Sequence, residues 1–526
     1  MTPERGRWST LRIVLRDVGS LQIVIGVSML VPVLVSILYG EMFSAVSFLI
    51  ASGVTGTAGY LASRLFRNAG EPERYHAMLV AGAGWMVTAI FGALPFIIAA
   101  WLTPAEVAQR FVPLGESYTS SLVYFRNPLH ALFESMSAFT TTGLTMAVHE
   151  PSLGHGLLFY RSLGQWIGGV GVIVLSLAIV PRPRLGGGLE LYQSESSGGK
   201  IRPSILGTTR AIWKIYTALT AALVIYLFLA TVIILPGRDV HVVLFESVNH
   251  AMAGLATGGF SPLDDSIAGY GSFAMEIVHL LPMLLGVVAI PLHYLFLRRR
   301  EYGAFRDDPQ VRLLVLIIAV VTPFLVLTLL GTPAVPNPVR DALFQVVSAL
   351  SGTGWQTSDI GNWSASAMLL LAGGTMIVGG SAGSTAGGFK LIRAYVLLRS
   401  IVWRVRKMFL PTYAVLPFRL GTRRLPVQGM HREVSDAATI SFLYLAVLGI
   451  SLVLAAHLTP VEFTLGDALF ESISAQGTVG LSTGITQPDM PVSLELLFIF
   501  QMWVGRLEIF PVLVLIRAVG GWIVRR

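Results

Sequence analysis

The chain has 526 residues, of which 54% are hydrophobic and only 13% are charged, about half the charged fraction of an average soluble domain. This composition excludes a soluble globular protein, and the length leaves room for about ten membrane-spanning helices of about 20 residues each. Cysteine is absent and the formal net charge is +8, which excludes disulfides and thiolate metal sites and fits the positive-inside rule better than nucleic-acid binding.

Ten continuous apolar runs, taken in chain order, predict ten transmembrane helices. They lie at residues 19–39, 42–62, 77–102, 157–181, 211–236, 270–297, 313–331, 363–402, 437–459 and 493–524. With a cytoplasmic N-terminus, all but six of the 37 Lys and Arg residues fall in segments on the cytoplasmic side; the exceptions are Arg110, Arg126, Arg161, Arg238, Arg340 and Arg506. We therefore expect an all-α integral membrane protein, in the inner (plasma) membrane of the cell, with both termini in the cytoplasm.

Short segments between alternate spans resemble one another, which predicts a fourfold internal repeat. Residues 131–138 and 468–475 are identical at seven of eight positions, residues 342–349 keep five of the eight, and residues 244–247 begin a fourth copy. The second copy is longer by four residues, about one helical turn, between its Phe and the next aligned glycine. We therefore divide the chain into a two-span N-terminal extension and four repeats of span, pore helix and span, at residues 1–76, 77–181, 211–297, 313–407 and 437–526.

Each short helix runs into a segment rich in Gly, Thr and Ser that is not expected to be regular helix. Irregular backbone at membrane depth is tolerated only when it is buried in protein or lines a water-filled path. Four such segments around one axis form a ring of carbonyls that can replace the water shell of a monovalent cation, and glycine permits the backbone conformations required. The simpler alternative is that the glycines are turns or packing points. The expected ion-binding residues are Thr141, Thr142, Gly143, Thr257, Gly258, Gly259, Gly352, Thr353, Gly354, Thr478, Val479 and Gly480.

The apolar run at residues 363–402 is too long for one span, because as a straight helix it measures about 60 Å, twice the hydrocarbon thickness. We expect it to break in its Gly- and Ser-rich middle, where an unwound segment can lie under the pore as a gate; a simple kink is the alternative. Arg506 is placed at the same gate, because a charge inside a span usually marks a partner or a pathway; alternatively, it clamps pore-helix carbonyls or Glu471. The candidate gate residues in segment 379–390 are Gly379, Gly380, Ser381, Gly383, Ser384, Thr385, Gly387, Gly388 and Lys390.

With these features the sequence resembles the Trk/Ktr potassium-uptake superfamily, specifically its Trk-type translocating membrane subunit. The resemblance rests on the four repeats, on the two additional N-terminal spans, and on the stretches at residues 165–169, 379–390 and 505–508. It implies potassium permeation through a pseudo-fourfold pore, a homodimer, and regulation by a separate cytoplasmic ring of nucleotide-binding subunits. Trp355 departs from the phenylalanine that often follows the third filter glycine in this family.

We therefore expect potassium uptake across the cell membrane through a potassium-selective pore, gated by segment 379–390 and by a regulatory cytoplasmic subunit. The potassium ion is the expected substrate, the lipid bilayer is the surrounding partner, and neither a cofactor nor a nucleic acid is expected. A symporter that couples potassium to sodium or protons is the alternative, kept open by Glu276 and Glu508. An enzyme is not expected, because we find no nucleophile with a base and no metal motif.

Overall fold

The computed structural model describes residues 3–113, 115–179, 205–333, 335–411, 413–421 and 423–523, and most of these residues are helical. Among them, six helices are long and apolar enough to cross a bilayer, and the number rises to eight when each of two strongly bent helix pairs is taken as one span. The helical, membrane-type architecture predicted from the composition is confirmed, whereas the count of ten spans remains a prediction.

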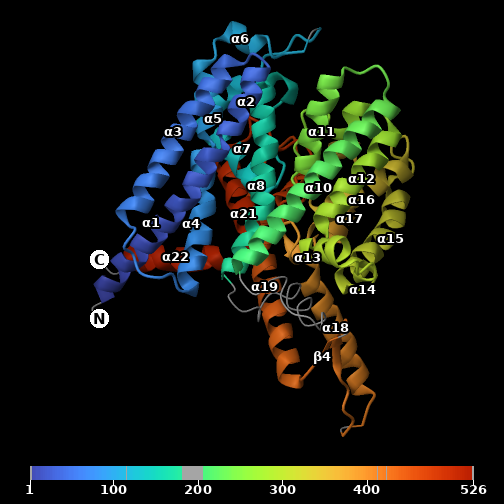
Figure 1. The fold of residues 1–526 in the computed structure, drawn as a ribbon. Helices are drawn as coiled ribbons and strands as arrows, with labels where there is room; N and C mark the ends of the chain where they lie inside the picture. Colours follow the sequence, from blue (N-terminus) through green and yellow to red (C-terminus); the bar gives the residue numbers. More distant parts are fainter. Residues whose placement is uncertain are drawn as a thin grey trace.

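The N-terminal extension is a helical hairpin at one side of the bundle (Figure 1). Its helices are α1 (Pro3–Ser28), α2 (Leu30–Leu38) and α3 (Met42–Leu65). The break at Met29 precedes Pro32, whose ring clashes with the carbonyl four residues earlier. Glycines let α1 and α3 approach closely, since a Cβ on Gly59 would lie 2.6 Å from the carbonyl oxygen of Gly19.

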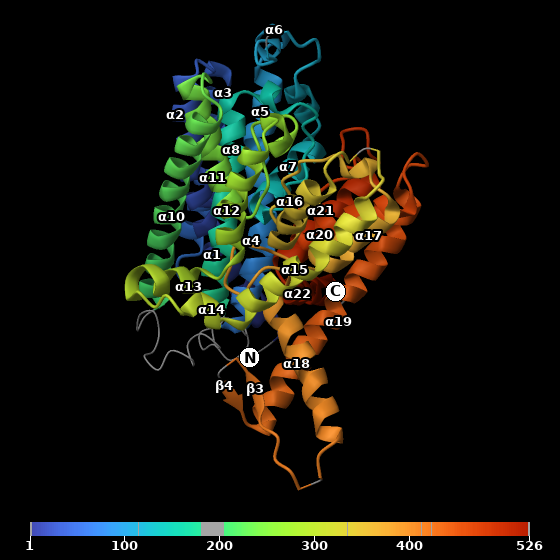
Figure 2. The same cartoon turned by 90° about the vertical axis from the view of Figure 1, so that its right-hand side faces the viewer.

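In the rest of the chain, four short, buried helices each follow another helix and, after an irregular segment, precede a further one. Figures 1 and 2 show these helices packed side by side. The preceding helices are α4 (Arg74–Gly92) with α5 (Leu94–Leu102), α10 (Ile205–Ile234), α15 (Pro309–Leu329) and α19 (Val427–Leu458). The short helices are α7 (Pro128–Thr140), α11 (Val240–Leu255), α16 (Pro338–Ser351) and α20 (Leu465–Gly477). The helices that follow the irregular segments are α8 (His155–Ile179), α12 (Phe273–Val287), the seven-residue α17 (Ala365–Leu371) and α21 (Val492–Arg506). The shorter connecting elements are α6 (Ala105–Gln109), η1 (Ser121–Arg126), η2 (Glu150–Leu153), η3 (Ser266–Tyr270), α13 (Ile290–Tyr294), η4 (Leu295–Arg299), α14 (Ala304–Asp307) and η5 (Ile360–Asn362).

The repeated phenylalanine of the short helices is part of the core. Phe133, Phe344 and Phe470 are almost fully buried, and only Phe245 of the second copy is partly exposed. One large apolar cluster joins Phe133 and Phe470 to residues of the N-terminal hairpin. The apolar faces of the short helices therefore fix them against the surrounding long helices.

Two of the predicted spans are not continuous helices, because each is sharply bent. The run at 270–297 bends by 102° between α12 and α13, and the run at 493–524 bends by 117° between α21 and α22 (Phe510–Ile523). Pro291 and Pro511 follow the two breaks and cannot donate a backbone hydrogen bond to continue the preceding helix. As a result, α22 runs crosswise to the bundle and packs on α4 (Figure 1).

The run at 363–402 is interrupted, as its length predicts. The helical segment α17 continues as a π-type turn, η6 (Ala372–Met376), and α-helix resumes only at α18 (Leu391–Met408). Between them, the two-residue strands β1 (Val378–Gly379) and β2 (Phe389–Lys390) pair in parallel, with Val378 opposite Phe389.

At one end of the molecule, α18 and the first part of α19 extend beyond the other helices (Figure 1). A small antiparallel hairpin of β3 (Phe418–Leu420) and β4 (Arg423–Leu425) links these two helices, with Phe418 opposite Leu425 (Figure 2). The predicted end of the first repeat and the first part of the basic segment after it fall in residues 180–204, outside the described residues.

Candidate functional site: four helix ends, a buried loop and an arginine

Each short helix is followed by a residue in the left-handed backbone region. These residues are Thr141 (φ 54°), Thr257 (φ 52°), Gly352 (φ 72°) and Thr478 (φ 51°). The next residue then donates its N–H to a carbonyl in the last helical turn; the N to O distances are 2.9 Å for Thr142 to Ser137, 2.8 Å for Gly258 to Ala253, 3.0 Å for Thr353 to Ser348 and 2.9 Å for Val479 to Ser474. This conformation costs a non-glycine residue roughly 1–2 kcal/mol. Three threonines adopt this left-handed conformation, so the surrounding structure holds the backbone there at the expense of local stability.

The predicted filter glycines close a ring. Gly143, Gly259, Gly354 and Gly480 have φ between +79° and +96°. A Cβ added to each would meet a carbonyl oxygen of the next segment: 2.4 Å from Gly143 to Gly258, 1.9 Å from Gly259 to Thr353, 1.9 Å from Gly354 to Val479, and 2.1 Å from Gly480 to Thr142. Each of these oxygens belongs to the residue just before the next glycine. The four segments therefore touch in the cyclic order one, two, three, four and back to one, which brings all twelve predicted ion-binding residues to one place.

A buried polar side chain on each short helix binds the segment that follows the predicted filter glycine. These side chains are Glu134, His250, Gln345 and Glu471, all fully buried. The Glu134 carboxylate accepts from Met146 N at 2.9 Å, His250 Nε2 lies 2.9 Å from Ser261 Oγ, Gln345 Nε2 donates to Thr357 Oγ1 at 3.4 Å, and Glu471 accepts from Thr483 N at 2.9 Å. This role was not predicted from the sequence, although Glu134 and Glu471 are the Glu of the repeated motif.

The second copy differs because α11 is longer, with 16 residues against 13 in α7. The motif residue Glu246 is therefore displaced by about one turn and pairs with Arg238 at 2.7 Å, while His250 takes the position behind the filter. The extra helical turn predicted from the spacing is thus confirmed.

Helix α8 supports the first two segments with two buried residues. Arg161 donates to Glu134 at 2.7 Å, and its guanidinium lies 4.1 Å from the ring centre of Phe260. Gln165 donates from Nε2 to Gly258 O at 2.5 Å and accepts from Phe260 N at 3.1 Å. These contacts couple the second long helix of one unit to the filter segment of the next.

Segment 379–390 lies directly against the filter segments. A Cβ on Gly387 would be 2.0 Å from Thr478 Oγ1, and one on Gly388 would be 3.0 Å from Gly477 O. Thr385 donates its hydroxyl to Leu255 O and Gly286 O, both at 2.9 Å, in a shared hydrogen bond. The segment is therefore packed beneath the ends of α11 and α20, and its small residues are what permit this approach.

The rest of the segment is anchored to neighbouring helices. Ser381 N donates to Val287 O at 3.1 Å, and Gly383 O accepts from Ile290 N at 3.0 Å, so the segment fills the break between α12 and α13. The buried Lys390 closes the segment by donating to the carbonyl of Ala386. Gly379 and Gly380 precede the first of these anchors and Ser384 follows the second. A Cβ on Gly379 would meet the Gly387 oxygen at 2.3 Å.

Arg506 reaches this segment from the end of α21. Its side chain is 1% exposed; one terminal nitrogen donates to Thr385 O at 2.7 Å and the other to Gly168 O in α8 at 2.8 Å. It makes no contact with Glu471, whose carboxylate is occupied by Ser482, Thr483 and Thr486. Arg506 therefore joins segment 379–390 to helix α8.

Four buried hydroxyls in the filter and the segment beneath it have no hydrogen-bond partner within the described part of the chain. They are those of Thr141, Thr478, Ser381 and Ser384. Buried hydroxyls are nearly always satisfied, by protein, water or an ion. Hydroxyl oxygens without a hydrogen-bond partner are suitable ligands for a hard monovalent cation or for its hydration water.

The two carboxylates that kept a coupled symporter open are both paired. Glu276 binds Arg340 through two hydrogen bonds of 2.5 and 2.7 Å, and Glu508 contacts Arg393 at the start of α18. Within the described part of the chain, each of these carboxylates therefore has an arginine partner.

Comparisons with known proteins agree over almost the whole chain. A family model described as a cation transport protein, TrkH, matches residues 76–519. An uncharacterised cation transporter of Methanocaldococcus jannaschii is 31% identical over 95% of this chain and 94% of its own length. The Trk system potassium uptake protein TrkH of Escherichia coli K12 is also 31% identical, over 96% of this chain and 98% of its own. The crystal structure of the potassium transporter TrkH from Vibrio parahaemolyticus superposes with a TM-score of 0.78 at 27% identity, covering 96% of this chain and 98% of that one.

Proposed function

Because this chain belongs to the TrkH family of cation transport proteins, we propose that it conducts potassium into the cell through one pore, formed where its four filter segments meet. It is a multi-pass membrane transporter and not an enzyme, and potassium is its substrate. The observation that carries the pore proposal is the closed ring of close approaches through Gly143, Gly259, Gly354 and Gly480. Such a ring surrounds a single axis and offers backbone oxygens from all four units to one dehydrated ion.

The test is a set of four Gly→Ser variants, one at each filter glycine, studied as tracer flux into liposomes under potassium, rubidium and sodium gradients. We expect each serine to weaken the discrimination of potassium from sodium, because a side chain enters the space that sets the carbonyl spacing. If all four folded variants retain the wild-type ratio of potassium to sodium flux, the filter assignment is wrong.

We further propose that segment 379–390 is the gate and that Arg506 holds it closed. The support is the Arg506 hydrogen bond to Thr385 O together with the contact between Gly387 and the Thr478 hydroxyl. Shortening the segment or changing Arg506→Ala should raise flux per folded molecule, and the double change should give less than the sum if both open one barrier. Arg432→Ala, on the exposed face of α19, is the control. Unchanged or lower flux in both single variants contradicts the gate.

The direction of transport and the coupling are tested together. We place both termini in the cytoplasm and the protein in the inner membrane, because nearly all Lys and Arg then lie inside. A pore driven by the membrane potential, worth about 2.3 kcal/mol per charge per 100 mV, reverses its flux when only the voltage is reversed. A symporter instead needs a sodium or proton gradient, and flux that follows such a gradient at zero voltage would establish the alternative.

The part of α18 and α19 that protrudes from the bundle is proposed to bind a cytoplasmic ring of nucleotide-binding subunits, and the chain is proposed to form a homodimer. The later part of the basic segment 390–436 lies in this projection (Figure 2). Native mass spectrometry of the chain co-expressed with such a subunit should give a complex containing two copies of the chain. Finding only the single chain, under conditions that keep it folded, contradicts both assignments.

A further inference from the structure

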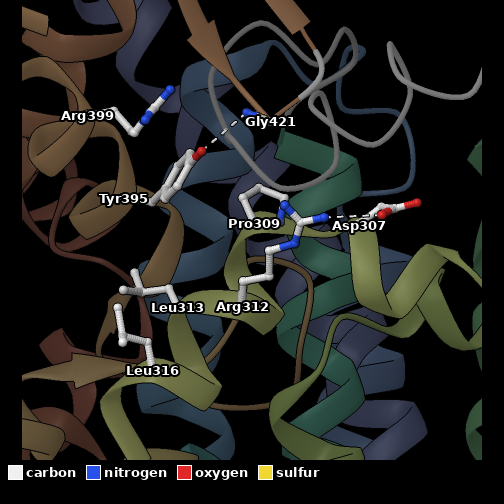
Figure 3. A pocket seen from close by; sticks show the side chains of 8 residues that line it. All are labelled: Asp307, Pro309, Arg312, Leu313, Leu316, Tyr395, Arg399 and Gly421. Atoms are coloured by element: carbon white, nitrogen blue, oxygen red, sulfur yellow. Dashed lines mark hydrogen bonds and ion pairs between the residues drawn. The ribbon is translucent and has the colours of Figure 1, made fainter. Parts of the chain in front are cut away.

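A cavity of about 410 Å³ opens beside the N-terminus of α15, and its lining residues belong neither to the filter nor to segment 379–390. Figure 3 shows its lining: Arg312, Leu313 and Leu316 come from α15, and Tyr395 and Arg399 come from α18. The two leucines lie together at one end of the cavity, and Arg399 lies near Tyr395 on the side of the β3–β4 hairpin (Figure 3). The cavity is thus polar and basic at one end and apolar at the other.

The basic end has unused hydrogen-bond donors. Arg312 uses Nε on Arg306 O at 2.6 Å and one terminal nitrogen on Asp307 at 3.1 Å, which leaves its second terminal nitrogen without a bond among the described residues. Arg399 makes no hydrogen bond or ion pair with any residue that the structure describes. The Tyr395 hydroxyl accepts from Gly421 N at 3.4 Å, so its own proton remains available. Two guanidinium groups against one carboxylate give the cavity an excess of positive charge.

The apolar end continues along the membrane-facing side of α15. Leu316, Val320 and Phe324 follow Arg312 at intervals of four residues, so all four side chains lie on one ridge of the helix. Leu316, Val320 and Phe324 are 57%, 47% and 58% exposed within the chain. Since α15 is one of the helices apolar enough to cross the bilayer, Arg312 in its first turn lies at the membrane surface and the ridge leads into the hydrocarbon.

We propose that this cavity binds the phosphate headgroup of an anionic phospholipid, whose acyl chain lies along the ridge of Leu316, Val320 and Phe324. Guanidinium groups bind phosphate oxygens through paired, charge-assisted hydrogen bonds, and a tyrosine hydroxyl adds a third donor. Basic pockets between transmembrane helices at the membrane surface are suited to such headgroups. A soluble phosphate would use the same donors but would have no use for the exposed apolar ridge, which is why a lipid is the occupant.

The test compares the full-length chain, delipidated and reloaded with phosphatidylglycerol or phosphatidylcholine, by native mass spectrometry. The wild type should retain phosphatidylglycerol in preference to phosphatidylcholine, and the Arg312→Gln/Arg399→Gln variant should lose about fivefold in affinity for each arginine removed. Arg432→Gln, which removes an exposed arginine of α19 outside the cavity, should bind like the wild type. Equal retention of the two lipids, or an equal loss in Arg432→Gln, overturns the proposal.

A second pair of measurements separates a lipid from a free phosphate and from misfolding. Leu316→Ser should weaken phosphatidylglycerol binding while leaving competition by inorganic phosphate unchanged, because only a lipid uses the ridge. Arg399→Lys keeps the charge, so it should fold and retain most of the phosphatidylglycerol binding. It therefore replaces the double variant in the test if the double variant folds poorly. Binding that ignores Leu316→Ser and is fully displaced by inorganic phosphate would assign the cavity to a soluble phosphate and refute the lipid.

Discussion

The strongest test of the ring compares one alanine substitution at two glycines with the same backbone angle. Gly259 and Gly331 both have φ +82°, but a Cβ at Gly331 has no atom within 4 Å, whereas one at Gly259 would lie 1.9 Å from Thr353 O. Both variants lose roughly 1–2 kcal/mol for placing alanine in the left-handed region. Only Gly259→Ala also forces the neighbouring backbone to retreat, by about 1.5 Å, before the contact becomes an ordinary one of 3.4 Å.

The extra cost at Gly259 has a distinct functional effect. Forcing additional atoms into a packed site typically costs 1–3 kcal/mol, and at the filter this cost falls on the geometry that coordinates the ion. Since each 1.36 kcal/mol changes a rate tenfold, we expect rubidium flux per folded Gly259→Ala molecule to fall by roughly ten- to a hundredfold. Gly331→Ala should unfold at a lower temperature with unchanged flux per folded molecule. Equal fluxes in the two variants, measured in liposomes at matched amounts of folded protein, would refute the assignment of this ring as the ion filter.

Three further outcomes are expected. Glu471→Gln replaces an acceptor of several hydrogen bonds with an amide that has only one acceptor oxygen; it should cost roughly 1.5–3 kcal/mol in unfolding free energy and lower selectivity, which denaturation and flux ratios will check. Thr385→Val keeps the side-chain shape but removes the hydroxyl that donates to Leu255 O and Gly286 O. Flux measured without a regulatory subunit should therefore rise. A valine variant with the same flux as the wild type would argue against a gating role for this hydrogen bond. Burial raises the pKa of Glu150, which lies between the first filter segment and α8, to about 8 despite the nearby Arg161. The carboxyl is therefore mostly protonated at pH 7 and becomes negatively charged as the pH rises through 8. Flux at low potassium should increase over that pH interval, and Glu150→Gln should remove the increase.

The irregular segments after the short helices, the break in the run at 363–402 and the position of Arg506 inside a span could be predicted from the sequence, because each leaves a local composition signal. Glycine and threonine at one spacing in four copies, and a single arginine deep in an apolar run, are visible without tertiary structure. The bends after α12 and α21 were missed, since hydropathy averages over a run that stays apolar through the break. The ring of Glu134, His250, Gln345 and Glu471 was missed for another reason: three residue types fill one structural position, and the longer α11 displaces Glu246 from it.

The clamp made by Arg506 also constrains the biosynthesis of the protein. Its partner Gly168 lies 338 residues earlier in the chain, and the last contact of the ring, from Gly480 to Thr142, joins the same distant units. At about 5–20 residues added per second, the ribosome needs roughly 20 to 70 s to supply the missing half of each contact. During that time the segment after α7 lacks the neighbour that Gly480 supplies in the folded protein. The nascent chain therefore requires shielding by the insertion machinery until its final unit arrives, and a chain truncated before that unit should be a substrate for membrane proteases instead of a leaking pore.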